Sequence, residues 1–551
     1  MLNHIRPWLA QHPRWAITLL VCAVLSPFLA KPFNIDDPLF VWLARQVQAH
    51  PGDPFGFGVN WYRSVWPMWT VTENPPLAGY YYALAGSILG WNEIGLHLAG
   101  LLAALAVIAG THRLARRFCQ HPLLAACAVL FTPIFLVSAN TVMCDMLMLA
   151  FWVWTVVFWV EGLEQNNFPK IMAAGLLMAL ALLTKYFGVA LLPLLAVHGA
   201  LEKRKVGSWV AGLLIPLAAL GAYQWLTLAL YRHPLFSAAA GFATVVQSQL
   251  GFSKVSGGLI ALAFTGGGAA SALFLAPVLW RRRTLALSTA GAIILGGAAC
   301  GGGRFLHQYA ALGTFADRAE VSGQFIFWLL GGLLVLGLAA SDVGRNYRDA
   351  RAWLLALWVG GTFFFTAFAN WTVNGRSLLP LLPAVGILIA RRWEAAGQRR
   401  FGALLIGLGA SALLALLVAE SDFQLAVAVR RSVQEVFALH SENRAAVWFE
   451  GHWGFQYYMQ AQGATAVDFN RSRQLPGDLL VLPEHNTDVS QPPPETVARC
   501  ETVSVPLGSW LTTWRADEGA GFYSSVVGPL PFAFGKVPPE VVFICELKAG
   551  K

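Results

Sequence analysis

The sequence predicts an α-helical polytopic membrane protein of about 13 transmembrane helices, followed by a small C-terminal α/β domain. The first observation is composition: 56% of the 551 residues are hydrophobic and only 12% are charged, with a mean hydropathy of +0.56. That leaves too little polar surface for a soluble protein of this size. The second is spacing, because apolar runs of roughly 17 to 25 residues, long enough for a helix to cross a bilayer, follow one another to about residue 419.

The basic residues predict the orientation of these spans. The net charge is +9, but the arginines and lysines gather in short clusters between apolar runs. This is the pattern of the positive-inside rule, so binding to nucleic acid is not expected. With Arg6 and Arg14 in the cytoplasm, every later cluster falls on the cytoplasmic side: residues 113–117, 203–205, 281–283, 345–351, 391–392 and 399–400.

The spans then follow in order. The first, at 15–31, lacks the small residue expected three positions before a cleavage site, so we predict an uncleaved anchor. A long outer loop at 31–92 precedes a second span at 93–111. Later outer connections are expected at 139–144, 184–188, 231–256 and 301–322, and the last span at 401–419. An odd number of spans places the remainder outside, which predicts a bacterial inner-membrane protein with a cytoplasmic N-terminus and a periplasmic C-terminal domain.

Residues 1–419 are thus the predicted membrane domain, and residues 420–551 the outer domain. In the outer domain, 446–449, 478–482 and 540–547 have the character of strands, and 452–462 of a helix. It also contains Cys500 and Cys545. An oxidising compartment would permit a disulfide between them, but the sequence does not supply the distance that this bond requires.

The most informative residues are Asp36 and Asp37, in the first outer loop. Adjacent carboxylates at a bilayer surface are costly if desolvated, so they are usually solvated, paired or used in chemistry. Asp36 could instead cap the helix that begins near Pro38.

Other polar residues fall at the same predicted outer face. Asp145 begins the fourth span, Lys185 and Tyr186 end the fifth, and Arg376 precedes a later span. Lys185 and Arg376 could be snorkelling interface anchors, and Asp145 could be a helix cap. The remaining candidates lie in the outer loops: Glu73, Asn74, Tyr81, Arg304, His307 and Arg318.

Four segments together resemble a known group of enzymes. Residues 36–45, with Asp36-Asp37, Leu39-Phe40 and Ala44-Arg45, resemble the Asp-Glu, aromatic, Ala-Arg signature of the GT-C class of integral-membrane glycosyltransferases. The similarity is to the protein O-mannosyltransferase and aminoarabinose transferase group. Residues 74–82, 183–186 and 376–383 resemble, in order, its Pro-Pro-Leu with Tyr-Tyr, Leu-Thr-Lys and Arg-x-Leu-Leu-Pro segments.

The resemblance implies a GT-C fold and an inverting transfer of a sugar from a polyprenyl-phosphate donor to a lipid, glycan or protein acceptor at the outer face. It implies a general base at Asp36 or Asp37, and donor-phosphate contacts from Lys185 and Arg376, with Arg304 and Arg318 as further candidates. Glu73, Asn74, Tyr81, Asp145, Tyr186 and His307 are the remaining candidates for contact with substrate. If a divalent metal ion takes part, Asp36, Glu73 and Asp145 are its candidate ligands.

Two positions depart from the pattern of the group. Glu73-Asn74-Pro75 stands where aminoarabinose transferases carry Glu-Lys-Pro, which argues against aminoarabinose as the sugar. Asp37 replaces the usual Glu, so the division of roles between Asp36 and Asp37 stays open.

Two other functions are compatible with a polytopic membrane protein. A polysaccharide polymerase or O-antigen ligase also uses polyprenyl-linked sugars, but lacks the acidic pair in the first loop. A secondary transporter usually carries charges at mid-membrane and repeated halves, and neither is visible here.

Overall fold

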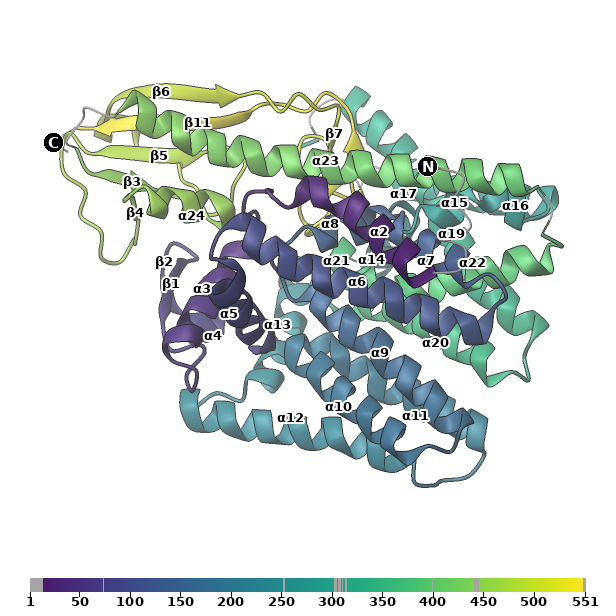
Figure 1. Cartoon of the computed structure of the whole chain (residues 1–551). Helices are drawn as coiled ribbons and strands as arrows, with labels where there is room; N and C mark the ends of the chain where they lie inside the picture. Colours follow the sequence, from purple (N-terminus) through teal and green to yellow (C-terminus); the bar gives the residue numbers. More distant parts are fainter. Residues whose placement is uncertain are drawn as a thin grey trace, which may run out of the picture.

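The computed structural model describes residues 13–72, 74–250, 253–301, 305, 309, 311–312, 315–398, 400–440 and 445–548. A bundle of helices makes up most of the molecule, and a β-sheet extends from one end of it (Figure 1). The fold class predicted from the sequence, a helical protein with a C-terminal α/β region, is confirmed.

The first predicted span is helix α2 (Pro13–Leu25), continued by a short 3₁₀ turn at Ser26–Phe28. The segment after it, which the sequence predicts as an outer loop, is well structured. It contains α3 (Asp37–Ala49), a hairpin of β1 (Gly58–Trp61) and β2 (Ser64–Pro67), α4 (Met68–Val71) and α5 (Leu77–Leu89). Tyr62 and Arg63 turn the hairpin with positive φ angles of 50° and 65°, the backbone that a two-residue turn between twisted strands requires.

The bundle is built mainly from long apolar helices. Up to the middle of the chain these are α6 (Glu93–Phe118), α7 (Pro122–Leu130), α8 (Pro133–Ala139), α9 (Asp145–Glu164), α10 (Phe168–Thr184), α11 (Leu191–Lys203), α12 (Val210–Tyr231) and α13 (Leu235–Leu250). There follow α14 (Lys254–Gly268), α15 (Ser271–Phe274), α16 (Ala276–Leu279), α17 (Arg282–Gly301), α19 (Phe315–Arg345), α20 (Ala350–Phe364), α21 (Gly375–Leu378), α22 (Leu382–Ala395) and α23 (Phe401–Leu439).

Among the described residues, seven helices are long and apolar enough to cross a membrane, or eight if the bent pair α7 and α8 forms one span. Shorter apolar helices accompany them, including α5 and α10. The connections at 139–144 and 184–188 lie where the sequence predicts them, whereas the expected loop at 231–256 contains helix α13. The figure of about 13 spans stays a prediction.

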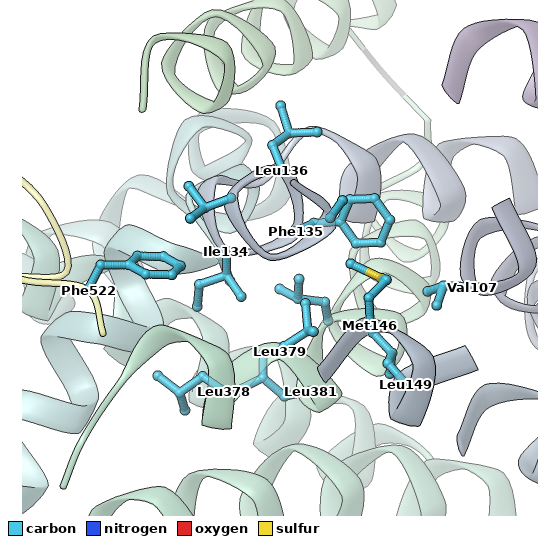
Figure 2. Packing of buried hydrophobic residues seen from close by; sticks show 14 of the residues in the cluster. Val107, Ile134, Phe135, Leu136, Met146, Leu149, Leu378, Leu379, Leu381 and Phe522 are labelled. Atoms are coloured by element: carbon cyan, nitrogen blue, oxygen red, sulfur yellow. The ribbon is translucent and has the colours of Figure 1, made fainter. Parts of the chain in front are cut away.

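A buried apolar cluster lies between the starts of helices α9 and α21. Figure 2 shows Ile134, Phe135 and Leu136 of α8 packed with Met146 and Leu149 of α9, and with the turn that follows α21. Phe522, from the C-terminal region, enters the same cluster. This packing fixes the starts of α9 and α21 relative to each other, because neither can move without opening a cavity.

The C-terminal region contains a five-stranded mixed sheet in the order β4-β3-β5-β11-β6. Its strands are β3 (Val447–Phe449), β4 (Thr465–Ala466), β5 (Leu479–Pro483), β6 (Val497–Val505) and β11 (Glu540–Leu547), and α24 (Trp453–Ala461) follows β3. The three predicted strands and the predicted helix are present, while β4 and β6 are additional. Cys500 and Cys545 face each other on β6 and β11 and form a disulfide.

The predicted boundary at residue 419 does not coincide with a helix end. Helix α23 continues for five more turns, to Leu439, and the sheet packs against this second half (Figure 1). Charged residues after 419 suggested the end of a span, but Leu425, Val433 and Val436 continue a buried helical face. The C-terminal region therefore shares a helix with the bundle.

Candidate active site

Asp36 lies just before α3, in a backbone segment of unusual conformation. Ile35 beside it has a φ of 47°, which is rare for a β-branched residue and is found where surrounding structure enforces it. Within the described residues, the Asp36 side chain makes no capping hydrogen bond to α3. Its Oδ2 instead accepts a hydrogen bond from Nη2 of Arg376 at 3.0 Å, and the side chain is 27% exposed. The capping interpretation of Asp36 is therefore not supported.

Asp37 has a different environment. It is fully buried, and its two carboxylate oxygens accept hydrogen bonds from the backbone N–H groups of Asn34, at 2.9 Å, and Val142, at 2.8 Å. Burial raises the pKa of Asp37 to about 7, against the opposing effects of Lys31 and the two N–H donors. Asp37 ties the segment before α3 to the connection between α8 and α9, while Asp36 keeps some contact with solvent.

Arg376 lies at the start of α21, between two carboxylates. Besides the contact with Asp36, its Nη1 lies 3.9 Å from Oδ2 of Asp145, and its guanidinium lies 5.6 Å from the ring centroid of Tyr523. The backbone N–H of Gly375 donates to the carbonyl of Phe522 at 2.8 Å. A Cβ at Gly375 would lie 2.7 Å from the Phe522 ring, so only glycine permits this approach.

Asp145 is the first residue of α9, and Lys185 follows the end of α10. The Lys185 Nζ donates to Oδ1 of Asp145 at 2.5 Å. The Asp145 side chain is only 1% exposed, so it needs cationic partners to remain charged. The paired geometry does not support the interpretation of Lys185 and Arg376 as lipid-facing anchors.

Four residues from distant parts of the chain thus form one row of alternating charge, which we call the acidic-basic cluster: Asp36, Arg376, Asp145 and Lys185. The partly exposed carboxylate of Asp36 can accept a proton, and the two cations of the cluster can stabilise an anionic leaving group. The buried Asp145 holds the two cations in place.

The role of a metal ion stays a prediction, because only two of its three candidate ligands, Asp36 and Asp145, lie among the described residues and Glu73 does not. The carboxylates of Asp36 and Asp145 are already engaged by Arg376 and Lys185. Throughout the part of the chain that the structure describes, no group of three His, Cys, Asp or Glu side chains is placed to hold a metal.

The other candidates from the sequence are placed less directly. The Tyr81 hydroxyl donates to the carbonyl of Ala99 at 2.7 Å, and Tyr186 makes a hydroxyl contact with Tyr223 at 3.3 Å. Asn74 is half-buried just before α5, and Arg318 donates to the carbonyl of Leu312 at 3.0 Å. Glu73, Arg304 and His307 lie outside the described residues.

The sequence analysis missed a second buried ion pair, Lys31 with Asp422. The Lys31 Nζ also donates to the carbonyl of Asn140, and Asp422 accepts hydrogen bonds from the hydroxyls of Thr513 and Tyr523. Tyr523 also lies beside Arg376. The ion pair of Lys31 and Asp422 is therefore linked to the acidic-basic cluster through Tyr523. The available signal was a lysine at the end of the first apolar run and two acidic residues, Glu420 and Asp422, just after the last one.

Comparison with known proteins gives one family match. Residues 73–225 match the family described as Dolichyl-phosphate-mannose-protein mannosyltransferase. This segment includes Asp145 and Lys185, whereas Asp36 and Arg376 lie outside it. The predicted resemblance to the protein O-mannosyltransferase group is confirmed over this part of the chain. No curated protein matches the sequence.

Solved structures show a looser similarity. An Archaeoglobus fulgidus oligosaccharyltransferase, tethered with an acceptor peptide containing the NVT sequon, aligns with a TM-score of 0.46 and 13% identity, over 84% of this chain and 64% of that one. ArnT from Cupriavidus metallidurans bound to undecaprenyl phosphate aligns with a TM-score of 0.43 and 15% identity, over 87% and 93%. Because both TM-scores lie below 0.5, these similarities carry no conclusion about the activity of this chain.

Proposed function

We propose that this protein is a membrane glycosyltransferase that moves a sugar from a polyprenyl-phosphate carrier to a lipid, glycan or protein acceptor, with inversion at the anomeric carbon. The observation that carries the proposal is the acidic-basic cluster, in which Asp36, Arg376, Asp145 and Lys185 meet from four separate segments. The family match over residues 73–225 supports the same class of reaction. The outer face of a bacterial inner membrane is the proposed location, in keeping with the positive-inside pattern.

The cluster suggests how the reaction would proceed. The acceptor oxygen attacks the anomeric carbon, the bond from that carbon to the phosphate oxygen breaks, and the acceptor proton passes to Asp36. Lys185 and Arg376 stabilise the negative charge that develops on the departing carrier phosphate.

The contact between Asp36 and Arg376 suggests that donor binding comes before proton transfer to Asp36. One Nη of Arg376 donates to the Asp36 carboxylate at 3.0 Å. A donor phosphate competes for the same guanidinium, since arginine binds phosphate strongly through several N–H groups. Donor binding would therefore release the Asp36 carboxylate to act as the base.

The experiment that tests this function compares envelope glycolipids and glycoproteins by mass spectrometry, with and without the gene. We expect a sugar-bearing product to vanish on deletion and to return with the wild-type gene. Asp36→Asn should not restore it, because general-base help is worth about 10² to 10⁴-fold in rate.

The matched control is Asp517→Asn, which removes an exposed carboxylate from the C-terminal region. This variant should restore the product fully. Restoration by Asp36→Asn to the same level as Asp517→Asn would contradict the assignment of Asp36, and unchanged envelope sugars after deletion would contradict the proposed reaction.

A further inference from the structure

A cavity of about 880 Å³ lies between α2, α6 and α9, away from the acidic-basic cluster. Its charged and polar lining comes from Arg14, Arg113, Arg116, Arg117, His112 and Glu161. We call it the arginine cavity. Four arginines and one carboxylate line it, so its charge is strongly positive.

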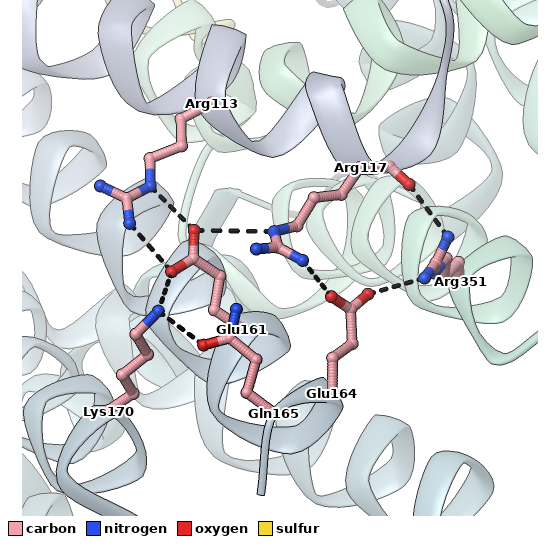
Figure 3. Close-up of polar contacts among 7 residues, drawn as sticks. All are labelled: Arg113, Arg117, Glu161, Glu164, Gln165, Lys170 and Arg351. Carbon is pink, nitrogen blue, oxygen red and sulfur yellow. Dashed lines mark hydrogen bonds and ion pairs between the residues drawn. The ribbon is translucent and has the colours of Figure 1, made fainter. Parts of the chain in front are cut away.

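The neighbouring ion pairs do not neutralise it. Figure 3 shows Glu161 paired with Arg113, Arg117 and Lys170, and Glu164 paired with Arg117 and Arg351. The two carboxylates, Glu161 and Glu164, are thus shared among four positively charged side chains. Within the residues that the structure describes, Arg14 and Arg116 have no acidic partner, and both are exposed.

The other side of the cavity is apolar. It is formed by Ile17, Leu105, Ala106, Ala109 and the indole of Trp154. A soluble phosphate would match the arginines but leave this wall in contact with water. An amphiphile with an anionic head and a hydrocarbon tail matches both halves.

The cavity and the acidic-basic cluster lie at opposite ends of helix α9. Asp145 begins α9, and Glu161 lies close to its end. On α6, Arg116 lies near the end while Glu93 at the start approaches the C-terminal region, with its Oε1 2.9 Å from the Tyr458 hydroxyl. At about 1.5 Å per residue, helix α9 rises roughly 24 Å from Asp145 to Glu161, which is most of the thickness of the hydrocarbon core of a bilayer.

We propose that the arginine cavity binds an anionic phospholipid from the leaflet opposite the acidic-basic cluster. The headgroup phosphate lies among Arg14, Arg113 and Arg116, and an acyl chain lies along the wall of Ile17 and Leu105. The inference does not depend on the proposed transferase activity. Basic pockets between membrane helices are suited to such headgroups because the arginines are held in a fixed cluster.

The test uses the full-length protein purified in detergent, with native mass spectrometry to count bound dioleoylphosphatidylglycerol. Dioleoylphosphatidylcholine, inorganic phosphate and undecaprenyl phosphate are the comparison ligands. We expect phosphatidylglycerol to bind in preference to phosphatidylcholine and inorganic phosphate. Undecaprenyl phosphate is expected at the acidic-basic cluster, so the cavity variants should leave its binding unchanged. Replacing Arg14 and Arg116 by glutamine together should weaken its binding by about thirty-fold, from about fivefold for each charge beside a lipid headgroup.

Two further variants make the result specific to the cavity. Arg282→Gln with Arg283→Gln removes the same number of exposed charges from another basic cluster and should leave binding unchanged. Ala109→Trp fills the cavity without altering charge and should weaken phosphatidylglycerol binding, whether or not the arginine variant folds.

Three outcomes would overturn the proposal. Equal losses from the two double-arginine variants would mean that general surface charge attracts the lipid. Unchanged binding in Ala109→Trp would place the lipid elsewhere. Preferential binding of inorganic phosphate or undecaprenyl phosphate in the cavity would assign it to a different ligand.

Discussion

Asp36 and Asp37 are neighbours in the sequence, yet the structure gives them different surroundings. Asp36 contacts Arg376 and keeps part of its surface in solvent, whereas Asp37 is buried and bound by two backbone N–H groups. The sequence could predict the importance of the pair but not this division. Which carboxylate is buried depends on the connection at 139–144, which is distant in the chain and reaches Asp37 only in the fold.

A first prediction concerns Asp37 and pH. Its pKa of about 7 in the folded protein lies above its ordinary value of 3.8. Between about pH 4 and pH 7 the folded state holds a proton that the unfolded state has lost, so the free energy of unfolding falls as pH rises through this window. The contribution is of the order of 4 kcal/mol, at about 1.4 kcal/mol for each pH step. It is fully present below about pH 4 and is lost above about pH 7.

The measurement is the apparent melting temperature of the purified wild type and of Asp37→Asn across pH 4 to 8. The variant does not titrate, so the melting temperature of the wild type should fall relative to that of the variant as pH rises from about 4 to about 7. Parallel curves for the two proteins would show that Asp37 does not titrate in this window.

A second prediction concerns Lys185. Lys185→Met should reduce the amount of glycosylated product by about 10²-fold, the usual cost of removing one group that stabilises a developing anion. Lys185→Arg keeps the charge beside Asp145 and should be milder. The mass-spectrometric comparison of envelope products provides the readout, and equal losses in both variants would argue against a role for the charge itself.

At the scale of elements, the second half of α23 joins the membrane bundle to the C-terminal region. Asp422 on this helix pairs with Lys31 and accepts hydrogen bonds from Thr513 and Tyr523.

A third prediction concerns this ion pair. Lys31→Met would leave Asp422 buried without its cation and should destabilise the protein by about 3 to 5 kcal/mol. The double change Lys31→Met with Asp422→Leu should recover much of that loss in a thermal unfolding measurement. A single variant as stable as the wild type would contradict the structural role of the pair.

Helices and strands could be predicted from the sequence where their own residues carry a clear apolar pattern. The long apolar runs identified most helices, and short apolar runs of β-forming residues identified β3, β5 and β11. Strand β6 was missed because its exposed positions, such as Arg499 and Glu501, weaken its apolar pattern. The extension of α23 was missed because charges within it resemble those at the end of a span, although Asp422 is buried by a partner almost 400 residues earlier. Pairing between distant segments leaves no local trace in either segment.

At the scale of the whole molecule, the basic clusters predict that residues 447–548 face the periplasm. A periplasm-dependent reporter fused after residue 548 should be active, and a cytoplasm-dependent reporter at the same place should be silent. The reverse result would place the acidic-basic cluster at the cytoplasmic face and the arginine cavity at the outer one.

The most direct test of the acidic-basic cluster is the binding of undecaprenyl phosphate to three purified variants, measured by native mass spectrometry. Arg376→Met should weaken binding by about 10- to 100-fold, the loss of a charge-assisted contact worth roughly 1.5 to 3 kcal/mol. Asp36→Asn should bind as tightly as the wild type or more tightly, because the carboxylate that competes for Arg376 has been removed. The control Arg431→Met changes an exposed arginine on α23 and should bind like the wild type. Unchanged binding in Arg376→Met would contradict the account, as would equal weakening in Arg376→Met and Asp36→Asn. Either result would mean that the donor phosphate does not replace Asp36 as the partner of Arg376.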